Sequence, residues 1–289
     1  MAEGFLLVDK PAGITSHGVV ARIRKALGVR RVGHAGTLDP MATGLLVCAV
    51  GRATRLVRYV QELEKEYLAV ARFGVATDTL DADGAVVHRE PMEVEPAEVE
   101  EAARRFVGRI LQVPPMTSAL KMEGRRLYEL AREGVEVERA AREVTIRELE
   151  ILEVTPSPYP EVEFRVVCGK GTYVRVLADD LARSLGGRAH LVALRRTRIG
   201  SLRVEEAVPL EPDRLKEAIL TPAEALRDLP SVVAPEETVR AAAHGMRFAT
   251  GPAEGLEEGR RFRLLDSDGR LVAVYRVKGR GSVPEVVLG

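Results

Sequence analysis

Asp39 lies in a short run of residues whose composition favours a reactive carboxylate. It stands between Leu38 and Pro40, with Gly36 and Gly44 on either side. A residue that precedes proline is pushed toward extended geometry, and glycines allow a backbone or a flat base to approach closely. A carboxylate on such a rigid loop suits a nucleophile or a general base. Taken locally, a turn aspartate that bonds its own backbone is the commoner case, so both interpretations stay open.

The other reactive residue types indicate neither a metal nor a nucleotide cofactor. The two cysteines, Cys48 and Cys168, are far apart in the sequence, and the five histidines show no paired metal-ligand spacing. A glycine-rich phosphate-binding loop is also missing from the sequence. We therefore predict that the protein uses no metal and no cofactor.

Basic residues cluster in one part of a chain that is neutral overall, with 43 basic and 43 acidic side chains. Between 164 and 203 only Asp179 and Asp180 oppose a set of cations, which are Arg165, Lys170, Arg175, Arg183, Arg188, Arg195, Arg196, Arg198 and Arg203. Such a cluster predicts either a phosphate-binding face or a set of scattered, solvated arginines. Charge alone does not decide between the two.

Strands and helices in mixed order must position these residues. The periodicity of apolar residues predicts strands at 4–8, 45–50, 67–75, 143–154 and 162–167. It predicts helices at 16–27, 52–63, 96–107, 125–133 and 173–185. Ser16 is the expected N-cap of the first helix and Gly28 its end. This order favours an α+β fold with a mixed, largely antiparallel sheet.

The C-terminal tail differs in pattern from the rest of the chain. After the proline-containing stretch 228–235, a short helix at 237–243 precedes strand-like runs at 261–265, 271–277 and 283–288. Asp268 and Gly269 form a hairpin signal between the first two runs. We therefore predict a larger domain at 1–229 and a small C-terminal β-barrel at 230–289.

Membrane insertion and secretion are not indicated. No apolar run reaches the roughly 20 residues needed to span a bilayer, and the first residues lack the basic and apolar segments of a signal peptide. We expect a cytoplasmic protein.

The run GHAGTLDPMATG at 33–44 resembles the catalytic motif of the TruB family, whose members convert the uridine at position 55 of the tRNA T-loop to pseudouridine. Further motifs match in the family's order: LVDKPAG at 7–13, KEY at 65–67, TDTLDADG at 77–84, SALK at 118–121, GTYVR at 171–175 and LRR at 194–196. So many ordered matches over 5–200 form a specific signal. The C-terminal tail resembles, more loosely, the PUA domain that often follows this catalytic body.

The resemblance implies a tRNA pseudouridine synthase, an isomerase, with three catalytic residues. Asp39 corresponds to the nucleophile, which attacks a flipped-out uridine at the ring C6 or the sugar C1′. Tyr67 corresponds to the residue that stacks on the target base, although a core aromatic is the alternative from its strand position. Arg175 corresponds to the arginine paired with Asp39, and a guanidinium suits that role because it keeps a carboxylate ionised in a dry pocket.

The resemblance also implies a set of residues that contact the substrate RNA. His34 would enter the T-loop where the extruded base has left a gap, Tyr173 would orient the catalytic pair, and Leu194 would form the apolar wall of the pocket. Lys10, Arg195 and Arg196 complete the expected RNA-binding set. Residues of the C-terminal domain, with basic side chains at 260–280, are expected to bind the acceptor end of the tRNA.

The expected partner is therefore tRNA, through its T-stem-loop, and the expected state is a monomer without an obligatory protein partner. Two alternatives remain. One is the same chemistry on other RNA with guide-RNA partners, as in relatives of this family. The other is an RNA-binding or tRNA-folding protein that catalyses no reaction. The expected catalytic residues argue against it, because a protein that only binds RNA has no use for an ionised carboxylate that faces the phosphates.

Overall fold

The computed structural model describes residues 3–118, 121–122, 125–127, 130, 133–135, 137–249, 251–252 and 254–288. The chain divides into two compact units. Unit 1 comprises Met1–Asp39, Gly44–Glu62 and Ile199–Gly289, and unit 2 comprises Pro40–Thr43 and Leu63–Arg198. Among the described residues no helix is long and apolar enough to cross a membrane.

The first part of unit 1 is built on two largely apolar strands. β1 (Gly4–Lys10) pairs antiparallel with β3 (Thr43–Val50), with Leu6 opposite Cys48. β2 (Val32–His34) pairs antiparallel with the end of β3. Nearly every side chain of β1 and β3 is buried, which matches the continuous apolar runs in the sequence. The helical elements here are α1 (Ser16–Leu27), the 3-10 helix η1 (Gly51–Leu56) and α2 (Val57–Gln61).

Helix α1 shows one correction to the sequence analysis. Its N-cap is Thr15 and not Ser16, because the Thr15 side chain accepts a hydrogen bond from the Gly18 N–H. Ser16 is the buried first residue of the helix, and its hydroxyl donates a hydrogen bond to the Leu38 carbonyl. The C-terminal end is as expected, with Gly28 in the left-handed conformation at φ 65°. The expected helix at 52–63 is likewise replaced by η1 followed by the shorter α2.

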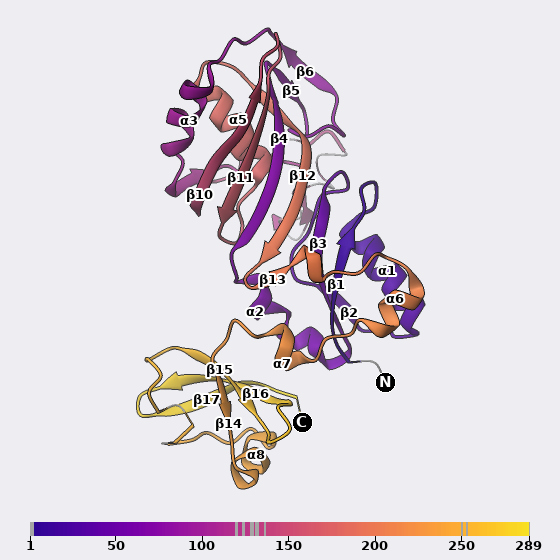
Figure 1. Cartoon of the computed structure of the whole chain (residues 1–289), viewed down its shortest axis with the longest axis vertical. Helices are drawn as coiled ribbons and strands as arrows, with labels where there is room; N and C mark the ends of the chain where they lie inside the picture. The colour runs from indigo at the N-terminus through magenta and orange to yellow at the C-terminus, as the bar shows by residue number, and fades with distance from the viewer. Residues whose placement is uncertain are drawn as a thin grey trace. The chain divides into compact units, whose positions relative to one another are not determined.

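The last part of unit 1 forms a separate small sheet with the strand order β14-β15-β16-β17 (orange to yellow in Figure 1). These strands are β14 (Ser231–Val233), β15 (Arg261–Leu265), β16 (Leu271–Lys278) and β17 (Gly281–Val287). Helix α8 (Glu236–Ala243) packs on it, and Phe262, Leu264 and Tyr275 form part of its own apolar core. β14 and β15 are parallel, whereas the other pairs are antiparallel. The segment before this sheet contains β13 (Leu202–Arg203), the 3-10 helix η2 (Val204–Glu206), α6 (Pro212–Glu217) and α7 (Pro222–Ala225).

Unit 2 is built on a sheet in which the strand order is β12-β4-β11-β10-β7. Its strands are β4 (Lys65–Phe73), β7 (Gly108–Gln112), β10 (Arg142–Thr155), β11 (Glu161–Cys168) and β12 (Ala189–Ile199). Helices α3 (Pro96–Arg104) and α5 (Val174–Ser184) lie side by side and contact this sheet (Figure 1). Pro96 occupies the first turn of α3, where its missing N–H costs nothing.

Two short hairpins complete unit 2. β5 (Val75–Thr77) pairs with β6 (Val86–Arg89), and β8 (Lys121–Met122) pairs with β9 (Arg125–Arg126). The expected helix at 125–133 is wrong at its start, because Arg125 and Arg126 are in a strand. Much of its remainder lies outside the described residues. The predicted α+β class, with a largely antiparallel sheet and a small C-terminal sheet domain, is confirmed.

Candidate functional site

Asp39 follows a loop that is fixed from both ends within unit 1. The hydroxyl of Ser16 accepts a hydrogen bond from the Leu38 N–H at 2.8 Å and donates to the Leu38 carbonyl at 3.0 Å. Ala35 donates its N–H to the Val47 carbonyl at 2.8 Å. Leu38 is buried and Asp39 is half-buried. The carboxylate is thus carried on an irregular segment that the first helix and β3 hold in place, as a rigidly presented reactive group requires.

His34 occupies the end of β2, opposite Cys48 of β3 in the register of the sheet, and is half-buried. Lys10 is the last residue of β1 and is fully buried. Its ammonium donates hydrogen bonds to the carbonyls of Pro11 at 2.9 Å and Ile14 at 2.8 Å. Lys10 therefore holds the loop between β1 and α1, and the structure places it among protein carbonyls.

Tyr67 lies on β4, where alternate side chains point into the core of unit 2. Lys65, Tyr67 and Ala69 are buried, whereas the residues between them are partly exposed, as the period of a strand requires. The guanidinium of Arg196 lies 6.0 Å from the centre of the Tyr67 ring, and Arg196 is only 1% exposed. A buried cation at this distance from an aromatic face is a favourable contact that restricts the ring's orientation.

Lys65 and Glu66 give the surroundings of Tyr67 a distinct electrostatic character. Burial, followed by the nearby charge of Arg196, lowers the pKa of Lys65 to about 8. Burial raises the pKa of Glu66, but hydrogen bonds from Thr197 and Arg198 outweigh it and hold the pKa below its ordinary value. The strand that carries Tyr67 therefore presents an ionised carboxylate on its partly exposed side and a perturbed amine on its buried side.

Arg175, near the start of α5, is the centre of a buried ionic cluster. Its side chain is 4% exposed, and Nη1 lies 2.9 Å from Oδ2 of Asp81, whose side chain is 5% exposed. The same nitrogen donates to the Thr79 carbonyl at 2.8 Å and to the Thr117 hydroxyl at 2.9 Å. A fully desolvated pair of this kind persists only when hydrogen bonds satisfy the remaining donors. Arg175 is therefore a fixed, permanently charged group.

The loop that supplies Asp81 is itself held in an uncommon conformation. Leu80 has a φ of 60°, in the left-handed region that residues other than glycine rarely adopt. The Leu80 carbonyl accepts a hydrogen bond at 3.0 Å from the N–H of Leu191, at the start of β12. The Thr79 hydroxyl donates to Oδ1 of Asp81 at 2.6 Å. Strain of this kind is typical of segments that fix a functional side chain.

Tyr173, Leu194 and Arg195 also lie in unit 2. Tyr173 is the N-cap of α5, and Gln112 of β7 both accepts its N–H at 3.0 Å and donates to its carbonyl at 3.3 Å. Leu194 on β12 is 7% exposed. Arg195 Nη1 lies 3.4 Å from the Thr43 hydroxyl. Gln112 thus anchors the residue two positions before Arg175 and helps to set its place.

Asp81, Thr117 and Gln112 were not among the site residues expected from the sequence. For Asp81 a signal was present, because it stands in the motif TDTLDADG at 77–84. The motif contains three aspartates, and only the fold shows which of them faces Arg175.

The expected catalytic and RNA-binding residues are divided between the two units. Asp39 belongs to unit 1, whereas Tyr67, Tyr173, Arg175 and Leu194 belong to unit 2.

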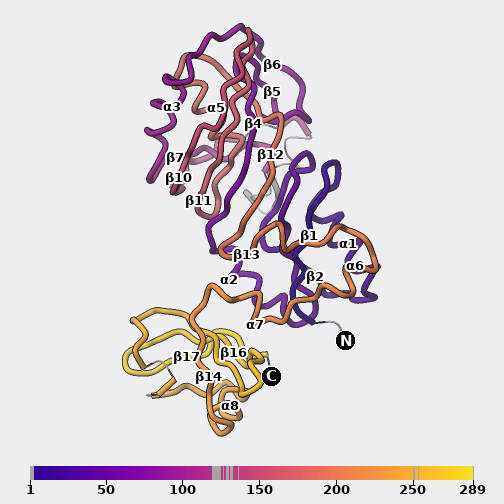
Figure 2. The backbone as a smooth tube through the Cα atoms, viewed as in Figure 1, coloured from indigo at the N-terminus to yellow at the C-terminus, as the bar shows by residue number. Residues whose placement is uncertain are grey.

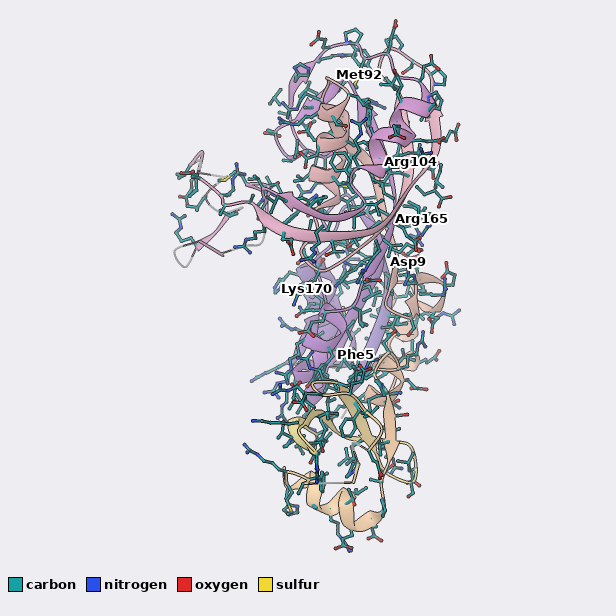
Figure 3. The ribbon with its side chains drawn as sticks, turned by 90° about the vertical axis from the view of Figure 1, so that its left-hand side faces the viewer. Phe5, Asp9, Met92, Arg104, Arg165 and Lys170 are labelled. Atoms are coloured by element: carbon teal, nitrogen blue, oxygen red, sulfur yellow. The ribbon has the colours of Figure 1, made fainter. Side chains whose placement is uncertain are left out.

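Several arginines of the basic cluster form ion pairs with carboxylates. Arg165 (labelled in Figure 3) forms ion pairs with Glu66, Glu148 and Glu150. Arg183 and Arg188 both pair with Asp179, whose pKa these contacts lower despite an opposing effect of burial. Because the partners of Arg165 lie outside 164–203, on neighbouring strands, a count of charges along that segment overestimated the positive charge around Arg165.

Among the described residues, no group of three or more histidine, cysteine, aspartate or glutamate side chains could hold a metal ion. Cys48 and Cys168 are buried free thiols. Burial raises the pKa of Cys168 to about 11, so this thiol is not a ready nucleophile. The chemically capable groups described here are the carboxylate of Asp39, the phenol of Tyr67 and the Arg175–Asp81 pair.

Comparisons with known proteins find similar sequences over nearly the whole chain. A family model described as TruB family pseudouridylate synthase (N-terminal domain) matches residues 24–174. The tRNA pseudouridine synthase B of Moorella thermoacetica is 44% identical, over 96% of this chain and 95% of that protein. The enzyme of the same name from Thermobifida fusca is 42% identical, over 99% of both chains.

Solved structures show the same architecture. A crystal structure of a Cbf5–Nop10–Gar1 complex matches with a TM-score of 0.75 at 28% identity, over 98% of this chain and 84% of that chain. An H/ACA ribonucleoprotein bound to a substrate RNA that contains 2′-deoxyuridine matches with a TM-score of 0.77 at 26% identity, over 99% and 85% of the two chains. The family model, the relatives and the fold lead to one conclusion: this chain belongs to the TruB family of pseudouridylate synthases.

Proposed function

We propose that this pseudouridylate synthase isomerises the uridine at position 55 in the T-loop of cytoplasmic tRNA, with Asp39 as the nucleophile. The observation that carries the proposal is the position of Asp39 in the family's motif, on a loop that Ser16 and β3 hold rigidly. The name shared by the bacterial relatives, tRNA pseudouridine synthase B, supports tRNA as the substrate.

The proposed reaction exchanges one carbon–nitrogen bond for one carbon–carbon bond. The ionised Asp39 attacks C6 of the base or C1′ of the sugar, and the bond between N1 and C1′ breaks. The detached base turns and forms a new bond from C5 to C1′, and the bond between Asp39 and C1′ or C6 breaks, which frees the carboxylate. The proton on C5 leaves to solvent, and N1 gains a proton. Because nothing is oxidised or hydrolysed, the reaction needs neither a redox partner nor an activated nucleotide.

Tyr67 and Arg175 supply a stacking surface for the base and a counter-charge for the carboxylate of Asp39. The Tyr67 ring offers a planar surface for the flipped-out base, and Arg196 restricts its orientation. Arg175 acts as the counter-charge of Asp39, which keeps the carboxylate ionised once RNA has excluded water. The support for this role is that Arg175 is buried and that Asp81, Thr79 and Thr117 already fix its guanidinium.

The remaining residues of the site bind or shape the RNA-binding surface. We assign His34 to the gap left in the T-loop, Tyr173 to the support of Arg175, and Leu194 to the apolar wall beside the base. Arg195 contacts the RNA backbone. We refine the roles of Lys10 and Arg196, since both are buried: Lys10 holds the loop before α1, and Arg196 positions Tyr67.

We further propose that 1–229 form the catalytic domain and 230–289 a PUA-like domain that binds the acceptor end of the tRNA. The support is that the C-terminal sheet has its own apolar core. Among its exposed basic residues, Arg240, Arg270 and Arg276 form ion pairs with Glu236, Asp268 and Glu285. The other exposed cations, Arg247, Arg260, Lys278 and Arg280, are available for phosphate.

The proposal is tested by incubating the isolated chain with a T-stem-loop RNA and mapping pseudouridine in it. We expect complete modification at the position that corresponds to 55, with no guide RNA and no protein partner. Modification only when a guide RNA and partner proteins are added would favour the guided alternative. Tight binding and faster tRNA folding without any pseudouridine would favour an RNA-folding protein.

A further inference from the structure

A cavity of about 420 Å³ lies in unit 2 between the β5–β6 hairpin and the turn that joins β10 to β11. Its lining residues are Arg72, Val75, Val86, Arg89, Thr155, Ser157, Tyr159, Glu161 and His190. A volume of this size falls within the roughly 300–1,000 Å³ that is usual for small-molecule sites. None of these residues belongs to the site described above, and Figure 2 shows the hairpin beside the start of β12, which carries His190.

His190 lines this cavity, and a hydrogen bond fixes the orientation of its ring. It is only 6% exposed, and its Nδ1 lies 2.8 Å from the Val75 carbonyl. A carbonyl oxygen can only accept, so Nδ1 must carry the proton, and in the neutral ring Nε2 is then a hydrogen-bond acceptor. Within the described part of the chain nothing bonds Nε2. A buried imidazole is thus oriented with an available acceptor on a residue that lines the cavity.

Tyr159 and Arg89 provide planar surfaces at the same cavity. The Arg89 guanidinium lies 4.7 Å from the centre of the Tyr159 ring. The ring lies close to the backbone of Gly74, where an added Cβ would be 3.0 Å from Tyr159 Cδ1 and 2.5 Å from the Glu90 carbonyl oxygen. Guanidinium and aromatic planes are the surfaces on which proteins stack single nucleobases.

The charges of the lining favour an anion. Arg72 is balanced by Glu161, with their nitrogen and oxygen 2.6 Å apart. Arg89 stacks on Tyr159 and contributes a net positive charge at the exposed rim of the cavity. Val75 and Val86 add apolar walls, and Val86 is 60% exposed. The cavity thus offers a hydrogen-bond acceptor on His190, planar surfaces on Tyr159 and Arg89, and the positive charge of Arg89. A ligand that matches these features is planar, donates a hydrogen bond from its edge and carries a phosphate.

We propose that this cavity is a second nucleotide-binding site, which takes one base with its phosphate. The base stacks on the Tyr159–Arg89 pair and donates an N–H to Nε2 of His190, while its phosphate lies at the Arg89 rim. The nucleotide comes either from a tRNA residue outside the T-loop or from a free mononucleotide, and the two share this chemistry. The site does not depend on the function proposed for Asp39.

The test uses the full-length protein with uridine monophosphate as the free probe and a tRNA transcript as the RNA probe. His190→Asn is the informative variant, since an asparagine amide can keep the hydrogen bond to the Val75 carbonyl while Nε2 is lost. Arg89→Gln removes the cation. Arg104→Gln, on the exposed surface of α3, is the matched control. The imidazole NMR signal of His190, assigned by its loss in His190→Asn, reports on this cavity and not on the Asp39 loop.

We expect uridine monophosphate to shift the His190 signal, and uridine without phosphate to bind about tenfold more weakly. Each of His190→Asn and Arg89→Gln weakens binding by about tenfold, as expected for one lost polar contact, while Arg104→Gln leaves it unchanged. If only the tRNA transcript shifts the signal, the nucleotide belongs to RNA. If neither probe shifts it, the proposal is overturned. Should His190→Asn fail to fold, equal affinity of Arg89→Gln and the wild type for both probes overturns it as well.

Discussion

Replacing Asp81 by asparagine removes the charge that faces Arg175 and keeps the shape of the side chain. Both side chains are at most 5% exposed, so water cannot compensate the guanidinium that is left behind. Removing one partner of a buried ion pair usually costs about 3–5 kcal/mol. Arg175 keeps its bonds to Thr79 and Thr117, and we therefore expect the lower end, about 3 kcal/mol.

This loss is measured as a free energy of unfolding by denaturant titration, and as a fall in midpoint temperature of roughly 6–12 °C. Glu161→Gln is the matched control, because it breaks the exposed pair with Arg72 and should cost less than about 1 kcal/mol. Activity should fall by up to about 10²-fold in Asp81→Asn, since the guanidinium of Arg175 is held less firmly once its bond to Asp81 is lost. A loss of stability no larger than that of Glu161→Gln would refute the reasoning.

Two further predictions concern charged groups away from the site. Burial, followed by the charge of Asp179, raises the pKa of Asp180 to about 6 from 3.8. Because folding favours the protonated form, stability falls as pH rises from about 4 to 6. Asp180→Asn should remove this fall; because solvent screens this partly exposed carboxylate, we expect a gain of only about 1–2 kcal/mol at pH 7, measured by denaturation at about pH 4 and pH 7. Glu285 binds Arg261, Arg276 and the Tyr59 hydroxyl at 3.0–3.1 Å, so Glu285→Gln should lower the free energy of unfolding by about 1–2 kcal/mol. Glu236→Gln on exposed α8 serves as its control, and equal effects of the two would contradict this account.

The sequence predicted correctly those strands and helices that have a clear apolar periodicity and are bounded by chain-breaking residues. The buried strand at the N-terminus, the helix that ends at Gly28 and the two long strands around 155–160 were all found, because apolar runs and chain-breaking residues mark them clearly. The cap of α1 was misplaced by one residue, since threonine and serine are both good N-caps and only the fold shows that the Ser16 hydroxyl is needed by Leu38.

The site was only partly predictable, because ion pairs form between segments that are distant in sequence. Asp81 and Arg175 are separated by 94 positions, and nothing in their local surroundings links them. Similarly, Arg165 belongs to the basic cluster counted along the sequence, but Glu148 and Glu150 on the neighbouring strand bind it. A sequence shows which charges exist, whereas strand order and register decide which of them remain available.

The central claim is that the Asp39 carboxylate is the nucleophile, and a single-turnover assay of Asp39→Asn tests it most directly. Release of the C5 proton from labelled tRNA measures the reaction, and tRNA binding is measured in parallel. Asp228→Asn, a surface carboxylate of the same unit that binds Ser201, is the control. We predict that Asp39→Asn binds tRNA like the wild type and releases no C5 proton, because an amide of similar shape is a poor nucleophile. Release at a rate near that of the wild type would contradict the account.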